Sequence, residues 1–295
     1  MAGFRKAKRE QIYAKVLCAG PSGSGKTYSS LRLAIGIARR AGGRVAAIDT
    51  ENRRIRYYAS EFDFDDMQLS EPYSPESYIK AINEAVDAGY TVLVIDSISH
   101  EWDYCNDLNS KMPAGSNTWA NWKTITPRHD AFMEKILQSP IHVVATVRGK
   151  DEYVLEDKDG KKVPKKIGLG YKQRNDTEYN YTVVFNIDQK SHVADAVKDN
   201  THLFENRYEV LTEKDGEAIY DWANAGETPD VVEPQDTGKV AELIQGITSV
   251  VSDWDDAKKK KAAGAFKKIL VTTADYKTIT DVNKLQQCLE AIKSL

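Results

Sequence analysis

Hydrophobic positions in the first 150 residues fall into two alternating patterns. Short runs in which almost every residue is apolar, typical of strands buried on both faces, occupy residues 12–19, 45–48, 91–95 and 141–147. Segments with apolar residues every three or four positions, typical of amphipathic helices, lie between them at residues 28–41, 75–88 and 128–137. Apolar strands that alternate with helices predict an α/β fold with a mostly parallel sheet and helices on both of its faces.

The pattern changes after residue 150, where strands follow one another through short connections. We predict strands at residues 179–187, 191–197 and 207–211, and a loop or hairpin tip at residues 157–160 and the lysines that follow. The segment 102–122 is predicted to be a loop. Residues 226–238 (GETPDVVEPQDTG) are rich in proline, glycine and acids, which indicates a linker. The predicted organisation is a basic N-terminal arm (1–11), an α/β core (12–225), this linker (226–238) and a small helical C-terminal region (239–295).

The composition is that of a soluble globular protein, with 41% hydrophobic and 29% charged residues. No stretch approaches the roughly 18 apolar residues that cross a bilayer, and residues 1–10 carry no apolar signal segment, so we expect a cytoplasmic protein without a membrane partner. The isolated Cys18, Cys105 and Cys288 exclude a disulfide scaffold and show no metal-ligand spacing. The net charge of −3 does not indicate a nucleic-acid binder, so any such site has to come from a local patch.

A phosphate-binding motif begins where the first predicted strand ends. The sequence GPSGSGKT matches GxxxxGK[ST] at every fixed position and lies between a strand and a helix, as the motif requires. Its glycines let backbone N–H groups converge on phosphate oxygens, and the helix points the positive end of its dipole at the same anion. Lys26 would supply a cation to the β- and γ-phosphates, and the Thr27 hydroxyl would bind Mg²⁺. The residues expected to hold ATP are Gly20, Pro21, Ser22, Gly23, Ser24, Gly25, Lys26 and Thr27.

Two acidic residues at strand ends complete the expected chemistry. The apolar run VLVIDS contains Asp96, which we expect to hold Mg²⁺ and its water shell beside the phosphates. The run VAAIDTE ends in Glu51, which at the carboxyl edge of the sheet would polarise the attacking water. Lys26, Glu51 and Asp96 are therefore the predicted catalytic residues, with a solvated loop glutamate as the alternative interpretation of Glu51.

These motifs resemble those of RecA-like recombinases. IDTE at 48–51 is similar to their strand-end glutamate, and VIDSIS at 94–99 to their Walker B strand. Residues 4–200 also resemble a phage-encoded AAA-family ATPase group that includes single-strand annealing recombinases, in the segments GPSGSGKTYS, IDTEN, PYSPE, IDSISHEW, TPRH and ILQSP. The resemblance implies a RecA-like P-loop core, use of ATP and Mg²⁺, and self-assembly into a ring or filament. It further implies binding of single-stranded DNA for annealing or homologous recombination, with a single-stranded DNA-binding protein as a further partner.

The chain departs from the RecA pattern at three points. Thr146 stands where RecA-like proteins carry a glutamine that senses the γ-phosphate, and no separate DNA-binding domain precedes the P-loop. Lys198 falls where that pattern places the first of two lysines that reach a neighbour's ATP, but Asn200 stands at the second. Thr146 and Lys198 are kept as candidate nucleotide-binding residues. In the basic arm, Phe4 and Ala7 resemble the FxxA segment through which eukaryotic RecA relatives dock into a neighbouring subunit.

A local basic patch provides the candidate DNA site. Residues 158–174 contain seven lysines and arginines and one acid, Asp159. In RecA-like proteins the loops after the Walker B strand and after the next strand line the DNA channel, and a cationic groove with an aromatic face suits single strands. A solvated basic hairpin and a lid over ATP are the alternatives. The predicted DNA-binding residues are Arg148, Lys150, Lys161, Lys162, Lys165, Lys166, Lys172 and Arg174.

Two other functions remain open. A P-loop ATPase that loads a helicase or drives a packaging motor would need a helical lid after the sheet, whereas residues 179–211 supply strands. A small-molecule phosphotransferase would use the basic segment as a lid, but such kinases rarely carry a glutamate at the end of the strand that follows the P-loop helix.

Overall fold

The computed structural model describes residues 6–112, 119–158, 161–228, 237–252, 254–270, 276 and 282–293. Phe4, one of the predicted oligomerisation residues, lies outside these ranges. The chain divides into two compact units, Met1–Glu227 and Thr228–Leu295, which are described separately. Among the described residues, no helix combines the length and apolar character needed to cross a membrane.

The first unit is built on a sheet with the strand order β3-β2-β4-β5-β1-β7-β8-β9, and β6 pairs with β5 outside this path. Neighbouring strands from β3 to β7 are parallel, whereas the β7–β8, β8–β9 and β5–β6 pairs are antiparallel. The predicted α/β fold with a mostly parallel sheet is therefore confirmed. The strands are β1 (Lys15–Gly20), β2 (Val45–Asp49), β3 (Asp65–Gln68), β4 (Val92–Asp96), β5 (His142–Lys158), β6 (Lys161–Tyr171), β7 (Val183–Ile187), β8 (Ala194–Asp199) and β9 (Tyr208–Glu209).

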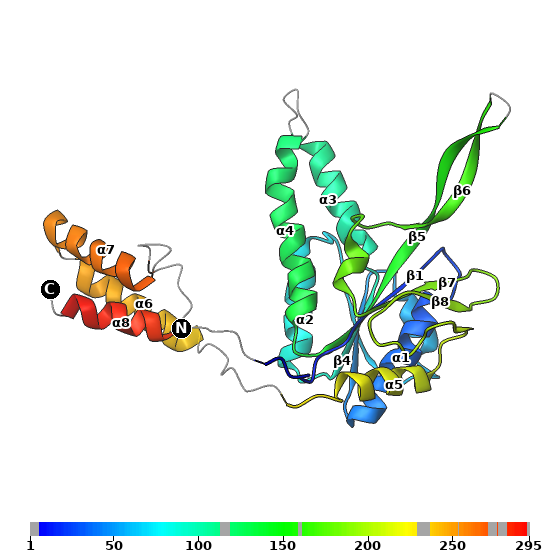
Figure 1. Ribbon diagram of the computed structural model, residues 1–295, viewed down its shortest axis with the longest axis horizontal. Helices are drawn as coiled ribbons and strands as arrows, with labels where there is room; N and C mark the ends of the chain where they lie inside the picture. Colours follow the sequence, from blue (N-terminus) through cyan, green and yellow to red (C-terminus); the bar gives the residue numbers. More distant parts are fainter. Residues whose placement is uncertain are drawn as a thin grey trace. The chain divides into compact units, whose positions relative to one another are not determined.

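Helices cover both faces of this sheet (Figure 1). The α-helices of the first unit are α1 (Lys26–Ala41), α2 (Pro75–Asp87), α3 (Ser99–Lys111), α4 (Trp119–Gln138) and α5 (Glu213–Ala223), and short 3-10 turns occupy Arg54–Tyr58 and Thr177–Asn180. Consecutive strand residues alternate between two hydrophobic clusters: Val16 and Cys18 pack with α1 and α5, and Leu17 packs with α2 and α4. Because both faces are buried, these strands show continuous apolar runs rather than alternation in the sequence.

The packing of α1 against α5 depends on two glycines at the contact. A Cβ atom on Gly36 would lie 1.9 Å from the Glu213 backbone oxygen, and one on Gly216 would lie 2.2 Å from that of Leu33. The two backbones can approach this closely only because both positions lack a side chain. This contact fixes the end of the first unit to the helix that follows the P-loop.

The structure corrects the prediction of a loop at residues 102–122. Residues 99–111 form helix α3, and α4 begins at Trp119, so most of the predicted loop at 102–122 is helical. The buried residues of α3 are Ser99, Glu101 and Cys105, so it has no apolar stripe that a sequence pattern could detect. The predicted hairpin tip at residues 157–160 agrees with the pairing of β5 and β6, which runs from Gly149↔Tyr171 out to Lys158↔Lys161 as an antiparallel ribbon beyond the main sheet (Figure 1). The lysines that follow the tip belong to β6.

The N-terminal segment is anchored to the end of the first unit. Gln11 N–H donates to the Glu227 carbonyl oxygen at 2.9 Å, and Glu227 N–H donates to that of Arg9 at 2.9 Å. The Arg9 guanidinium also lies 4.9 Å from the centre of the Trp222 ring. Gly226 and Glu227, at the start of the predicted linker, thus belong to the first unit.

The second unit contains α6 (Thr237–Ser252), α7 (Asp256–Leu270) and α8 (Val282–Lys293). These helices pack around a small core formed by Ile247, Ala262, Phe266, Leu285, Cys288 and Ile292.

Candidate functional site

The GPSGSGKT motif lies in the connection between β1 and α1. Gly25 adopts φ +85°, a left-handed conformation that side chains disfavour, and α1 begins at the next residue, Lys26. The Lys26 Nζ donates to the Pro21 carbonyl oxygen at 2.8 Å, so the amine lies over the loop that would hold phosphates. Burial lowers the pKa of Lys26, although the nearby carboxylates of Asp96 and Glu51 act in the opposite direction.

Asp96, the last residue of β4, links the P-loop helix to the neighbouring strand β5. The Thr27 hydroxyl donates to Asp96 Oδ2 at 2.6 Å, and the Thr146 hydroxyl donates to Oδ1. Burial raises the pKa of the Asp96 carboxyl, and these two hydrogen bonds work against that shift. A hydroxyl and a carboxylate in contact are hard oxygen donors of the kind that Mg²⁺ selects together with its own waters. Thr146, a candidate nucleotide-binding residue, thus contacts the candidate metal ligand.

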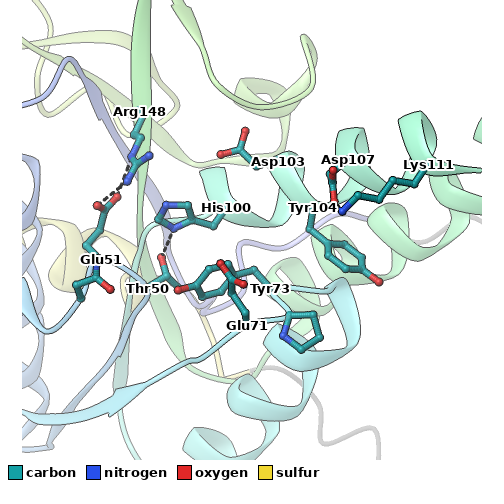
Figure 2. A pocket seen from close by; sticks show the side chains of 12 residues that line it. Thr50, Glu51, Glu71, Tyr73, His100, Asp103, Tyr104, Asp107, Lys111 and Arg148 are labelled. Carbon is teal, nitrogen blue, oxygen red and sulfur yellow. Dashed lines mark hydrogen bonds and ion pairs between the residues drawn. The ribbon is translucent and has the colours of Figure 1, made fainter.

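Glu51 follows β2 by two residues and forms a bidentate ion pair with Arg148 of β5 (Figure 2). Arg148 Nε donates to Oε1 at 2.8 Å and Nη2 donates to Oε2 at 2.6 Å. The Ser97 hydroxyl adds a longer hydrogen bond of 3.3 Å to Oε1. Burial works to raise the pKa of Glu51, but the hydrogen bonds and charge of Arg148 outweigh it, and the pKa lies below its usual value. The predicted catalytic glutamate is therefore paired with a predicted DNA-binding residue.

A cavity of about 760 Å³ opens beside this pair (Figure 2). His100 stacks on Tyr73 with ring centres 5.0 Å apart, and its Nδ1 lies 2.7 Å from the Thr50 hydroxyl. The charged lining is largely paired: Asp103 bonds to Lys172, and Asp107 bonds to Lys111. The cavity is lined by Thr50, Glu51, Asn52, Glu71, Pro72, Tyr73, His100, Asp103, Tyr104, Asp107, Lys111 and Arg148.

The predicted DNA-binding residues occupy two different surroundings. Lys172 and Arg174 follow the β5–β6 ribbon and are held by acids, with Lys172 Nζ 2.7 Å from Asp103 Oδ2 and Arg174 Nη1 2.8 Å from Asp130 Oδ1. The backbones of Lys150, Lys161, Lys162, Lys165 and Lys166 lie on the ribbon itself, away from the main sheet.

Lys198 lies near the amino ends of the parallel strands, whereas the P-loop follows the carboxyl end of β1. It pairs with Val184 near the start of β7, whereas the end of β7 at Ile187 approaches Gly20. Its Nζ donates to the carbonyl oxygens of Glu178 and Tyr179 at 3.2 Å and 2.7 Å. In this structure the Lys198 amine is thus engaged by backbone carbonyls near the start of β7 and makes no hydrogen bond to the described residues of the P-loop.

The turn between β7 and β8 contacts the P-loop, and no sequence signal indicates this. Gln189 Nε2 donates to the Ser22 carbonyl oxygen at 2.8 Å, and His192 Nδ1 donates to that of Ser24 at 3.0 Å. Both contacts use backbone carbonyl oxygens of the motif and engage none of its N–H groups, the groups that bind anions in such loops. The turn thus supports the loop from outside.

A buried polar cluster lies behind the site. His129 Nδ1 lies 3.1 Å from both carboxylate oxygens of Glu101, and Gln173 Nε2 donates to Glu101 Oε2 at 3.3 Å. Glu101 is fully buried, so these hydrogen bonds satisfy a polar side chain that would otherwise be costly to bury. The cluster joins α3, α4 and the segment after β6, and it fixes the base of the ribbon to the core.

Comparison with known protein families and sequences relates this chain to ATPase domains. The AAA domain family matches residues 12–215. RecA of Bacteroides thetaiotaomicron is 30% identical over 102 residues, which are 34% of this chain and 29% of that protein. RecA of Streptomyces venezuelae is 36% identical over 102 residues, 34% of this chain and 25% of that protein. The matched segment thus spans less than a third of these relatives. A KaiC-like protein, PH0186 of Pyrococcus horikoshii, aligns at 15% identity with a TM-score of 0.33, over 63% of this chain and 79% of that one.

Proposed function

The chain belongs to the AAA domain family and contains a RecA-like P-loop core, and from this membership we propose that it hydrolyses ATP while bound to single-stranded DNA. The reaction would serve annealing or homologous recombination in the manner of phage recombinases, with a single-stranded DNA-binding protein as a further partner. The observation that carries the nucleotide part is the contact between Thr27 and Asp96, which joins the P-loop to the Walker B strand.

The residues around that contact suit the hydrolysis of a nucleoside triphosphate. Lys26 and the P-loop amides would bind the phosphates, and Thr27 and Asp96 would hold Mg²⁺. The metal would supply charge neutralisation at the phosphate oxygens. Glu51 would accept a proton from the water that attacks the γ-phosphorus, while the bond to the β,γ-bridging oxygen breaks to leave ADP and phosphate.

The β5–β6 ribbon is the surface that we propose for DNA. It begins at Gly149, next to the Glu51–Arg148 pair, and its second strand carries Lys161, Lys162, Lys165 and Lys166. An extended ribbon with several cations can follow the phosphates of a single strand without reading its sequence. Because the ribbon begins next to the nucleotide site, DNA bound along it could affect ATP hydrolysis, and hydrolysis could affect DNA binding.

Self-assembly completes the proposal. Lys198 lies near the amino ends of the parallel strands, away from its own P-loop. We therefore propose that it contacts the ATP bound by a neighbouring subunit. Such a neighbour would be docked through the N-terminal arm, in which Phe4 and Ala7 are the proposed contact residues. Ala7 is exposed, as this role requires.

The test is ATP hydrolysis with and without single-stranded DNA. We expect Mg²⁺-dependent release of phosphate from the full-length chain, a higher rate with single-stranded than with double-stranded DNA, and no activity for Lys26→Ala. An ATPase that no DNA stimulates would favour a motor or loader acting on protein. Transfer of the phosphate to a small molecule instead of water would favour the phosphotransferase.

A further inference from the structure

Arg148 lies where the core sheet, the phosphate-binding motif and the β5–β6 ribbon meet. It occupies the last β5 position that pairs with β1, and its register partner is Gly20, the first residue of the phosphate-binding motif. The next residue, Gly149, already pairs with Tyr171 of the ribbon. The Arg148 side chain therefore starts beside the P-loop, at the point where the core sheet becomes the ribbon.

The Arg148 backbone is fixed, whereas its side chain retains hydrogen-bonding capacity. The backbone N–H donates to the Ser99 hydroxyl at 2.9 Å, and the carbonyl oxygen accepts from Lys172 N–H at 2.8 Å. Nε and Nη2 bind Glu51, and among the residues that the structure describes Nη1 has no hydrogen-bond partner. The side chain is 36% exposed and lines the cavity of Figure 2, so it can turn without disturbing the fold.

We propose that Arg148 exchanges Glu51 for the γ-phosphate of bound ATP, so that one movement senses the phosphate and releases the glutamate that activates water. This inference rests on the proposed ATPase function. It moves Arg148 from the DNA-binding set to the nucleotide site, and it gives the chain a γ-phosphate sensor two residues beyond Thr146.

The chemistry of the three groups favours this exchange. A guanidinium presents the same planar pair of donors to a carboxylate and to a phosphate. The terminal phosphate of ATP carries more negative charge than one carboxylate, and ADP has no γ-phosphate to offer. With ADP, Arg148 would remain on Glu51, whose two oxygens are then engaged by the guanidinium.

The position of Glu51 fits the second half of the exchange. Its side chain is only 16% exposed, so the ion pair is shielded from competition by solvent ions. Once Arg148 leaves, the carboxylate keeps the Ser97 hydroxyl as its remaining protein hydrogen bond among the described residues. A less heavily paired carboxylate is the better proton acceptor.

Nucleotide binding to the full-length chain, measured by calorimetry with Mg²⁺, tests the inference without hydrolysis. The two ligands are ADP and an ATP analogue with nitrogen in place of the β,γ-bridging oxygen. Arg148→Gln should weaken binding of the analogue roughly tenfold or more, the effect of one charge-assisted contact, and leave ADP binding unchanged. Arg128→Gln is the matched control, because Arg128 makes an equivalent bidentate pair with Glu76 at 2.7 Å and 2.8 Å. It should change neither affinity.

A double-variant cycle separates exchange from simple charge repulsion. Glu51→Gln should tighten binding of the analogue more than that of ADP, because Arg148 is released. In the Arg148→Gln background this gain should shrink, whereas repulsion between Glu51 and the phosphate alone would leave it intact. An unchanged ratio of analogue to ADP affinity in Arg148→Gln, or an intact gain in the double variant, would overturn the inference. A wild-type chain that binds neither nucleotide would instead refute the proposed function itself.

Discussion

The Thr27 hydroxyl donates a 2.6 Å hydrogen bond to the Asp96 carboxylate, which lies 69 residues later in the chain. This contact brings the two candidate Mg²⁺ ligands together. Thr27→Val keeps the shape of the side chain and removes the hydroxyl, so Mg²⁺-dependent binding of ATP should weaken on the order of tenfold or more. Ser30→Ala is a suitable control, because it removes another α1 hydroxyl, one that bonds to the Thr27 carbonyl oxygen. Equal Mg²⁺ dependence in Thr27→Val and wild type would contradict the metal assignment.

Glu51→Gln tests the proposed general base. The substitution keeps the size of the side chain but removes the negative charge that accepts a proton. We expect binding of ATP to be retained and its hydrolysis to slow about a hundredfold, the scale of lost general-base assistance. Single-turnover release of phosphate measures the chemical step directly. Hydrolysis at the wild-type rate would assign the activation of water to another group.

The lysines of β6 are expected to produce a steep dependence of DNA affinity on salt. The test variant carries glutamine in place of Lys161, Lys162, Lys165 and Lys166. Each lost phosphate contact on a single strand lowers the slope of log affinity against log salt by about 0.7, so four lost contacts should lower it by nearly 3 units. Fluorescence anisotropy with a labelled single strand measures the slope. The matched control replaces four consecutive lysines of α7, Lys258–Lys261, and should leave the slope unchanged. The reverse result would place the DNA site on the C-terminal unit.

The N-terminal arm should control assembly. If the active site is completed by a neighbouring subunit, hydrolysis per chain should rise with protein concentration, and Phe4→Ala should leave a folded monomer that binds ATP and hydrolyses little. Loss of a buried aromatic anchor is typically the most damaging change at an interface. Tyr208→Ala, an exposed aromatic on β9, serves as the control. Light scattering that finds wild-type assemblies in Phe4→Ala would remove Phe4 from the interface.

His142 should make stability depend on pH between about 4 and 6.5. Burial lowers the pKa of this histidine to about 4, with the charge of Lys15 acting in the same direction. Its Nδ1 accepts a hydrogen bond from Ala14 N–H at 3.1 Å, which requires the neutral ring. The folded-state pKa lies below the unfolded value, so this contribution is complete above pH 6.5 and is lost as pH falls through 4. Its total size is about 3 kcal/mol.

Urea unfolding at several pH values measures this effect. His142→Gln can still accept the Ala14 hydrogen bond but does not titrate, so its stability should change less across the same pH range. His202→Gln is the control, because His202 lies on the surface. An identical pH dependence of stability in His142→Gln and wild type would show that other groups are responsible.

Local sequence determined the strands of the core and the phosphate-binding loop. The motif at residues 20–27 is contiguous, so its chemistry depends on neighbours in the chain, and β2 and β4 are recognisable because both of their faces are buried. The same rule failed for α3, whose buried positions are mostly polar. The pattern indicated the hairpin tip at residues 157–160 but not the length of the β5–β6 ribbon, because pairing between strands outside the main sheet leaves no apolar run.

Only the tertiary structure decided which side chains meet. Arg148 and Glu51 are 97 residues apart, and they pair because β4 alone separates their strands β2 and β5 in the sheet. His192 reaches Ser24 because β7 lies beside β1. Lys198 is directed away from its own P-loop because β8 runs antiparallel to β7. Strand order and direction arise from packing of the whole chain, so the local residue pattern that predicts each strand cannot contain them.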